Sequence, residues 1–176
     1  MPVVSSLRVT TGRHQIRLRV HNESTTMITA DQILCHMIGD YLLQSDWMAQ
    51  KKTSSRLAAV AHCWTYCVPF AVMLYFQGKS LNLNTIGVIC GIYSTHYFID
   101  RFRLARYVCW LKNFLAPRWI EQYWVGLYMS RNYPWKYCRA TGYHSGRAAW
   151  LSVWLMIIAD NTLHVISNGL FLYMLR

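Results

Sequence analysis

The sequence predicts an all-α, polytopic membrane protein with about four transmembrane helices, because the chain is both apolar and basic. Of its 176 residues, 54% are hydrophobic and only 14% are charged, whereas soluble domains average about 25% charged residues. The formal net charge is +11, from 18 Lys and Arg against 7 Asp and Glu. This hydrophobicity excludes a disordered chain. Basic nucleic-acid-binding proteins are rarely so apolar, so we expect no nucleic-acid partner and assign the basic residues to loops beside a membrane.

Residues 1–26 differ from the remainder of the chain. They are polar, carry four Arg and contain no continuous apolar core of the kind that a signal peptide needs. We expect a flexible basic extension over 1–26 and a single helical membrane domain over 27–176. Alternatively, translation begins at Met27, just before the first apolar stretch.

Four apolar stretches are long enough to consider as membrane spans. They are residues 28–44, 57–76, 81–100 and 148–175. The first is the shortest and the most polar, and the last is long enough to cross the bilayer with a tilt. We expect each of the four to be a transmembrane helix.

A basic, aromatic segment joins the third stretch to the fourth. Its first part, RYVCWLKNFLAPRWIEQYW, mixes Trp, Tyr, Phe and Leu with Arg and Lys. That composition is typical of a helix lying in the membrane interface. An aromatic loop folded onto the helices is the alternative.

The basic residues of the loops predict an orientation, because cytoplasmic loops are enriched in Lys and Arg. With four spans, the connections 45–56 and 101–147 lie on one side of the membrane. They carry Lys51, Lys52, Arg56, Arg101, Arg103, Arg106, Lys112, Arg118, Arg131, Lys136, Arg139 and Arg147. We expect this side to face the cytoplasm of a bacterial cell, with both termini on the non-cytoplasmic side of the inner membrane.

The few acidic residues form a pattern with histidine. Three Asp–His pairs with a spacing of four occur in or at the end of the predicted spans, and a lone His62 lies near the start of the second span. The pairs are His36 with Asp40, His96 with Asp100, and Asp160 with His164. A spacing of four puts both side chains on one helix face. Each pair alone could simply join neighbouring helices by hydrogen bonds.

Three such pairs together favour a metal site. An Asp at the bilayer centre costs about 3 kcal/mol, so such residues tend to face the bundle interior and to be functional. If the carboxylates converge, a divalent cation would relieve their repulsion and use the neutral imidazoles as ligands. We expect Zn, Mn or Fe, in a pocket open to the cytoplasmic leaflet. The predicted ligands are His36, Asp40, His62, His96, Asp100, Asp160 and His164.

The same residues carry a resemblance to a protein family. The segments HMIGDYLLQSDWMAQKK, THYFIDRFRLARY and DNTLH occur in this order, with His62 after the first. They resemble the pattern of a bacterial and phage membrane protein family of unknown function, over about residues 28–165. One departure is Asn161, where the family usually has Gln. The family is distantly similar to membrane-bound metal-dependent hydrolases, so the resemblance implies a membrane location and gives weight to Gln44 and Lys51.

Three functions fit these residues. In a metal-dependent hydrolase, the ion would activate a water, Asp40, Asp100 or Asp160 would be catalytic, and the substrate would be a lipid or lipid-linked phosphate. The head group would be bound by Gln44, Lys51 and Arg101, although the two cations also fit simple flanking of a span. A carrier of metal ions or protons uses the same residue types. In a non-catalytic membrane protein, bacterial or phage-encoded, that acts through a host partner, the pairs would only join helices.

Overall fold

The computed structural model describes residues 27–112 and 135–175, and this part of the chain is helical apart from one isolated β-bridge between Cys138 and His144. Its elements are α1 (Ala30–Met37), a π-helix (Ile38–Leu42), α2 (Asp46–Lys51), α3 (Arg56–Phe76), α4 (Leu83–Phe102), α5 (Leu104–Leu111), a short 3₁₀ helix (Trp135–Tyr137) and α6 (Ala149–Tyr173). The predicted all-α class is confirmed for the described residues.

Side-chain caps set where the first four α-helices begin. In each case an oxygen of the residue before the helix accepts a hydrogen bond from a backbone N–H in the first turn, which otherwise lacks a partner. The capping residues are Thr29 for α1, Ser45 for α2, Ser55 for α3 and Asn82 for α4. Local sequence therefore defines these boundaries.

The prediction of about four transmembrane helices is wrong in number. Among the described residues, two helices are long and apolar enough to cross a membrane, α3 and α6. The first predicted span is a short helix that continues into the π-helix and ends at Leu42. These 13 residues reach only about 20 Å, against a hydrocarbon core of about 30 Å. The third predicted span does form the long helix α4, but its Asn, Thr, Ser, His and Asp residues make it too polar.

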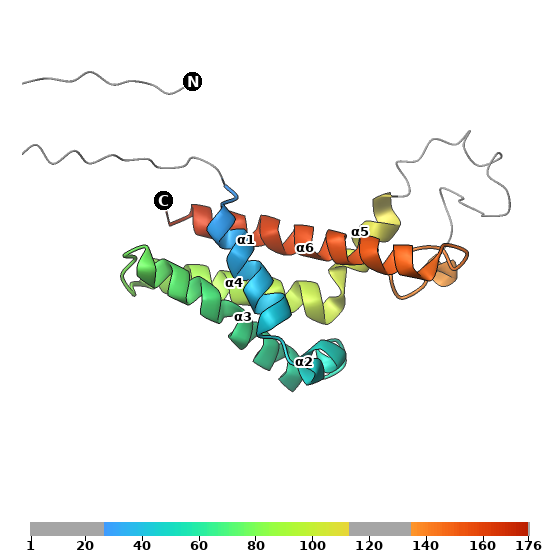
Figure 1. Ribbon diagram of the computed structural model, residues 1–176, viewed down its shortest axis with the longest axis horizontal. Helices are drawn as coiled ribbons and strands as arrows, with labels where there is room; N and C mark the ends of the chain where they lie inside the picture. The colour runs from blue at the N-terminus through green and yellow to red at the C-terminus, as the bar shows by residue number, and fades with distance from the viewer. Residues whose placement is uncertain (1–26, 113–134, 176) are drawn as a thin grey trace, which may run out of the picture.

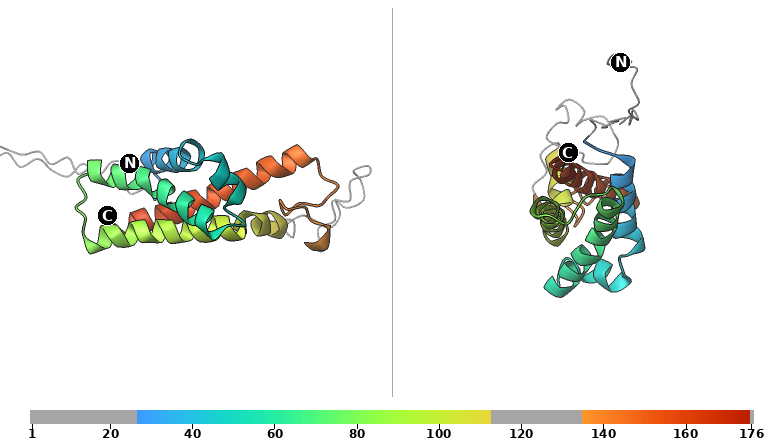
Figure 2. Two further views of the ribbon diagram at one scale, coloured as in Figure 1. Left: turned by 90° about the horizontal axis from the view of Figure 1, so that it is seen from below. Right: turned by 90° about the vertical axis from the view of Figure 1, so that its left-hand side faces the viewer.

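The three long helices form the body of the molecule. Helix α4 packs against both α3 and α6, and α1 contacts α3 and α6. Figure 1 shows α6 running along the length of the molecule with α1 crossing it, and the left view of Figure 2 shows the same elongated shape from below. The apolar core lies between α1, α3 and α4, and its buried members are Cys35, Tyr66, Cys67, Phe70, Val88 and Ile92.

The outer surfaces of the two apolar helices are apolar as well. On α3, Trp64 is 68% exposed, and Val68 and Val72 follow it at helical spacing. On α6, Trp150, Trp154 and Ile158 form a similar exposed row. The interior, by contrast, contains several fully buried imidazoles and amides. Rows of large exposed apolar side chains are unusual on a soluble domain.

Two expectations fall on residues that the structure does not describe. The flexible extension over 1–26 lies outside the described residues, and so do residues 113–124, which make up most of the predicted interfacial helix. The first part of that basic segment forms α5, which packs against α6. The chain reaches α5 through Arg103, which has a left-handed backbone conformation with φ 52° and ends α4.

Candidate metal centre

The expected His/Asp cluster is present in the interior of the fold. Asp40 comes from the π-helix, His62 from α3, and His96 with Asp100 from α4. Helix α6 contributes Asp160 and His164. Two overlapping sets of these side chains have ligand atoms close enough together to hold a metal ion. We call them the four-residue group (Asp40, His62, His96 and Asp100) and the three-residue group (Asp100, Asp160 and His164).

In the four-residue group, two imidazole nitrogens and two carboxylates point to one place. The Nε2 atoms of His62 and His96 are 2.9 Å apart. Asp100 Oδ2 lies 3.1 Å from each of them, and Asp40 Oδ1 lies 3.2 Å from His62 Nε2 and 3.5 Å from His96 Nε2. All four side chains are buried.

These separations match the spacing of ligands around a divalent ion. Atoms bound tetrahedrally to zinc at 2.0–2.1 Å lie about 3.3 Å from one another. Octahedral coordination with bonds of about 2.1 Å brings neighbouring ligands to about 3.0 Å. The measured separations, 2.9 to 3.5 Å, cover this range. The buried His/Asp groups are therefore positioned to hold a metal ion.

The three-residue group shares Asp100 and is more open. His164 Nε2 lies 3.4 Å from Asp100 Oδ1 and 3.7 Å from Asp160 Oδ2. His164 is completely buried, and neither of its ring nitrogens has a hydrogen-bond partner among the described residues. The Asp160 side chain is 29% exposed, whereas that of Asp100 is 3% exposed. Asp160 therefore faces solvent-accessible space.

His36, which the sequence predicted as a ligand, belongs to neither group. Its Nδ1 accepts a hydrogen bond from the Tyr66 hydroxyl at 2.9 Å, and its Nε2 donates to Asn161 Oδ1 at 2.9 Å. Asn168 donates to the Tyr66 oxygen at 2.6 Å, which leaves the Tyr66 proton for His36. His36 Nδ1 also lies 3.5 Å from Asp40 Oδ2, but a nitrogen that accepts from Tyr66 has no proton to donate to this carboxylate. His36 therefore lies beside the cluster, with both ring nitrogens bonded to residues outside the two groups.

Sequence reasoning missed Tyr66 and Asn168, both of which are fully buried beside the cluster. The Tyr66 ring stacks on His96 with a centroid separation of 3.6 Å. Gly39 allows this packing, because a Cβ there would meet the Tyr66 ring at 2.7 Å. A spacing rule could have found both residues: Tyr66 is four residues after His62, and Asn168 is four residues after His164.

The residues predicted to bind substrate lie at different distances from the cluster. Lys51 ends α2 and is exposed, while the next residue, Lys52, reaches the cluster. Lys52 Nζ lies 2.8 Å from Asp100 Oδ2 and donates to Gln44 Oε1 at 3.2 Å. Arg101 donates to the backbone carbonyl of Thr53. Gln44 thus reaches the cluster through Lys52, and Arg101 anchors the loop before α3.

Lys52 remains a cation in this setting. Burial alone would lower the pKa of its ammonium group, but the carboxylates of Asp100 and Asp40 outweigh burial and raise that pKa above its usual value. The ammonium supplies part of the positive charge that the three acids of the cluster require.

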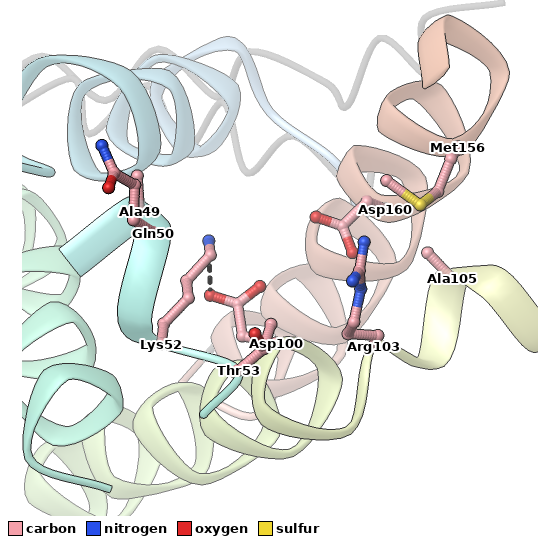
Figure 3. A pocket seen from close by; sticks show the side chains of 9 residues that line it. All are labelled: Ala49, Gln50, Lys52, Thr53, Asp100, Arg103, Ala105, Met156 and Asp160. Carbon is pink, nitrogen blue, oxygen red and sulfur yellow. Dashed lines mark ion pairs between the residues drawn. The ribbon is translucent and has the colours of Figure 1, made fainter. Parts of the chain in front are cut away.

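A pocket of about 260 Å³ opens beside the cluster. Its wall includes Asp100 and Asp160 together with the cations Lys52 and Arg103. Figure 3 shows Lys52 directed at Asp100, with Arg103 and Asp160 among the other side chains that line the pocket. Arg103 is also the non-glycine residue with a positive φ among those described, and such strain is often found at functional sites.

The fold and the cluster define an all-helical protein with buried His and Asp side chains arranged to bind a metal ion. The chain belongs to a family described as Protein of unknown function (DUF3307), which it matches over residues 28–124. That range includes every member of the four-residue group. It ends before Asp160 and His164. Comparisons with curated proteins and with solved structures give no match.

Proposed function

We propose that this protein is a membrane-embedded, metal-dependent hydrolase that acts on a lipid-linked phosphate. The observation that carries the proposal is the spacing of the four-residue group, in which buried imidazole and carboxylate atoms are separated by the distances of a metal coordination shell. Lys52 offsets only part of the charge of the two buried carboxylates, so their burial would be costly without a further cation. Imidazole and carboxylate ligands suit Zn, Mn or Fe.

The surface supports membrane insertion. Helices α3 and α6 are long and apolar enough to cross a bilayer, and both expose rows of large apolar side chains. We propose a bacterial inner membrane, with the basic loops facing the cytoplasm. Helix α4 would then be shielded from lipid in part by α3 and α6, which it contacts. The pocket beside the cluster would open toward the cytoplasmic leaflet.

The pocket supports an anionic substrate. Lys52 and Arg103 line it on the side of the cluster's carboxylates, so a phosphate group could reach both cations. A divalent ion, when bound, acidifies a water and withdraws charge from a phosphoryl oxygen. The water oxygen adds to phosphorus and the bond to the leaving alcohol breaks. Asp160 and His164 accept a proton from the attacking water. That proton then passes to the leaving oxygen, so the products are an alcohol and a phosphate.

The test begins with metal content. The protein is purified in detergent without chelators, and bound metals are measured by mass spectrometry. Phosphate release from phosphatidic acid in mixed micelles is then measured, with glycerol phosphate as a water-soluble comparison. We expect at least one Zn, Mn or Fe per chain, and release from the lipid that disappears with a chelator and returns with the metal.

Matched variants separate the site from general damage. Asp40→Asn should lose metal and activity, while Asp46→Asn, on the exposed start of α2, should keep both. Metal-free protein after metal supplementation would overturn the proposal. Release from glycerol phosphate alone would replace the lipid substrate with a soluble one.

One contact favours a second function, that of a non-catalytic membrane protein acting through a partner. Lys52 Nζ is 2.8 Å from Asp100 Oδ2 and 3.5 Å from His62 Nε2, so its ammonium could itself compensate the acids. In that case Lys52→Gln would destabilise the protein strongly and no metal would be found. In a hydrolase, the same variant keeps its metal.

A further inference from the structure

We infer that the cluster binds two divalent ions, and that Asp100 bridges them. The four-residue group would hold the first ion, and the three-residue group would hold the second. This inference rests on the proposed function. It gives Asp160 and His164 a more specific role, because they would bind the second ion and act on the water through it.

The two oxygens of Asp100 carry the argument. Its Oδ2 lies 3.1 Å from His62 Nε2 and 3.1 Å from His96 Nε2, inside the four-residue group. Its Oδ1 lies 3.4 Å from His164 Nε2, in the three-residue group. One carboxylate thus offers a different oxygen to each set of imidazoles. This is how a carboxylate bridges two ions that are about 3.5–4 Å apart, the usual separation in two-metal sites.

His164 provides an independent reason for a second ion. It is fully buried, and neither ring nitrogen has a hydrogen-bond partner among the described residues. A buried imidazole without a partner costs free energy. Its Nε2 is directed at two carboxylates, Asp100 and Asp160. A cation among these three atoms would give His164 Nε2 a partner and reduce the repulsion between the acids.

The His96 and His164 rings lie side by side next to one carboxylate. Their centroids are 4.2 Å apart, and the two rings are tilted by 31°. The Nε2 atom of each ring lies near a different oxygen of Asp100.

The two sites would differ in openness. Four buried side chains surround the first, which leaves little space for further ligands. Three side chains hold the second, and one of them, Asp160, lines the pocket with Lys52 and Arg103. A site with three protein ligands and an open position is typical of catalytic metals, whereas a four-ligand site is typical of structural ones. The second ion would therefore meet water and the phosphoryl group.

Metal counting tests the inference. Wild-type protein is dialysed against Mn²⁺, and bound ions per chain are measured together with the electron paramagnetic resonance spectrum. We expect two ions per chain and an exchange-coupled multiline signal. Asp160→Asn and His164→Ala should each hold one ion, give the spectrum of an isolated Mn²⁺, and reduce phosphate release about 100-fold or more.

Two matched variants serve as controls. Asp46→Asn and His144→Ala change the same residue types outside the cluster and should keep two coupled ions. One ion per chain in active wild type would overturn the two-ion inference and leave the proposed function intact. No ion at all would overturn both. If the cluster variants fail to fold, the wild-type spectrum decides, because an uncoupled signal at saturating Mn²⁺ contradicts a bridged pair.

Discussion

The long helices α3 and α4 are packed in two different ways along their length. Around Phe70, Val88 and Ile92, the contacts between them are apolar. Around His62, His96 and Asp100, the contacts are between acids and imidazoles. Burial stabilises the first region, while in the second it costs free energy unless the charges are compensated. Packing alone therefore accounts for the apolar region, whereas the polar region needs compensation of its charges, which a bound metal ion would provide.

The largest expected effect comes from Asp100, which belongs to both ligand groups. Asp100→Asn keeps the size of the side chain but removes the charge. We expect at least about 100-fold weaker metal binding, because even residues outside the first coordination shell contribute 10–100-fold. Metal titration of the purified variant measures this. Wild-type affinity would mean that the carboxylate is not a ligand.

A substitution in the apolar region should lower stability and leave metal binding unchanged. Phe70→Ala removes a fully buried ring, and such substitutions cost about 3–5 kcal/mol of stability. Thermal unfolding in detergent should show this loss, while the fraction that remains folded keeps its metal. If metal content per folded chain also fell, the two regions would not be separable.

Tyr66 lies between the apolar and the polar region, so substituting it tests whether the two regions act separately. Tyr66→Phe keeps the ring that stacks on His96 and removes the hydroxyl that links Asn168 to His36. We expect a 10–100-fold loss of metal affinity, typical for outer-shell partners, and a loss of about 1–3 kcal/mol of stability, because the buried Asn168 amide and His36 Nδ1 lose their hydrogen-bond partner. Tyr75→Phe, on the exposed surface of α3, is the matched control. Equal behaviour of the two variants would remove Tyr66 from the site.

Substitutions of the two neighbouring lysines, Lys51 and Lys52, should have a smaller effect, and the two variants can be compared directly. Lys52→Gln should raise the KM for phosphatidic acid about tenfold, equivalent to 1.4 kcal/mol, and leave metal content unchanged. Lys51→Gln should change neither, since Lys51 is exposed at the end of α2. If Lys51→Gln raised the KM and Lys52→Gln did not, the substrate would be bound by Lys51, the lysine that the sequence motif indicated.

The smallest effect is expected at Arg103. Arg103→Gly relieves a left-handed backbone conformation, φ 52°, which should raise stability by about 0.5–1 kcal/mol. The same change removes a cation from the pocket and should weaken substrate binding. Unfolding and phosphate release, measured on one preparation, would show the two opposite changes. A loss of stability would mean that the Arg103 side chain contributes packing that outweighs the strain.

The sequence predicted the cluster well because its signal is local. A His and an Asp four residues apart share a helix face, and three such pairs in a chain with few acids could be recognised without a structure. The same rule reaches further than the pairs themselves. Tyr66 follows His62 by four residues, and Asn168 follows His164 by four; both are buried beside the cluster. Extending the spacing along each helix would therefore have predicted these two neighbours of the cluster too.

The remaining features depend on packing between helices, and local spacing does not encode them. His36 is four residues from Asp40, the spacing that predicted a metal ligand. Its two ring nitrogens, however, form hydrogen bonds with Tyr66 and Asn161. The choice of Lys52 over Lys51 follows from where α2 ends and how it packs against α3. The number of spans was overestimated because the first apolar stretch breaks after Leu42, which hydrophobicity alone does not reveal.

The π-helix at Ile38–Leu42 has a consequence for how this site could arise or be lost. Its wide turn is closed by a bond from Leu43 N to Ile38 O at 3.0 Å, five residues apart. A π turn holds one residue more than an α turn, so a single deletion within it would let the chain resume α-helical winding while the residues on either side keep nearly their present directions. Asp40 lies inside this turn, so its own direction depends on the extra residue. The loss of one codon there, rather than any exchange of side chains, would therefore redirect Asp40 away from His62 and His96.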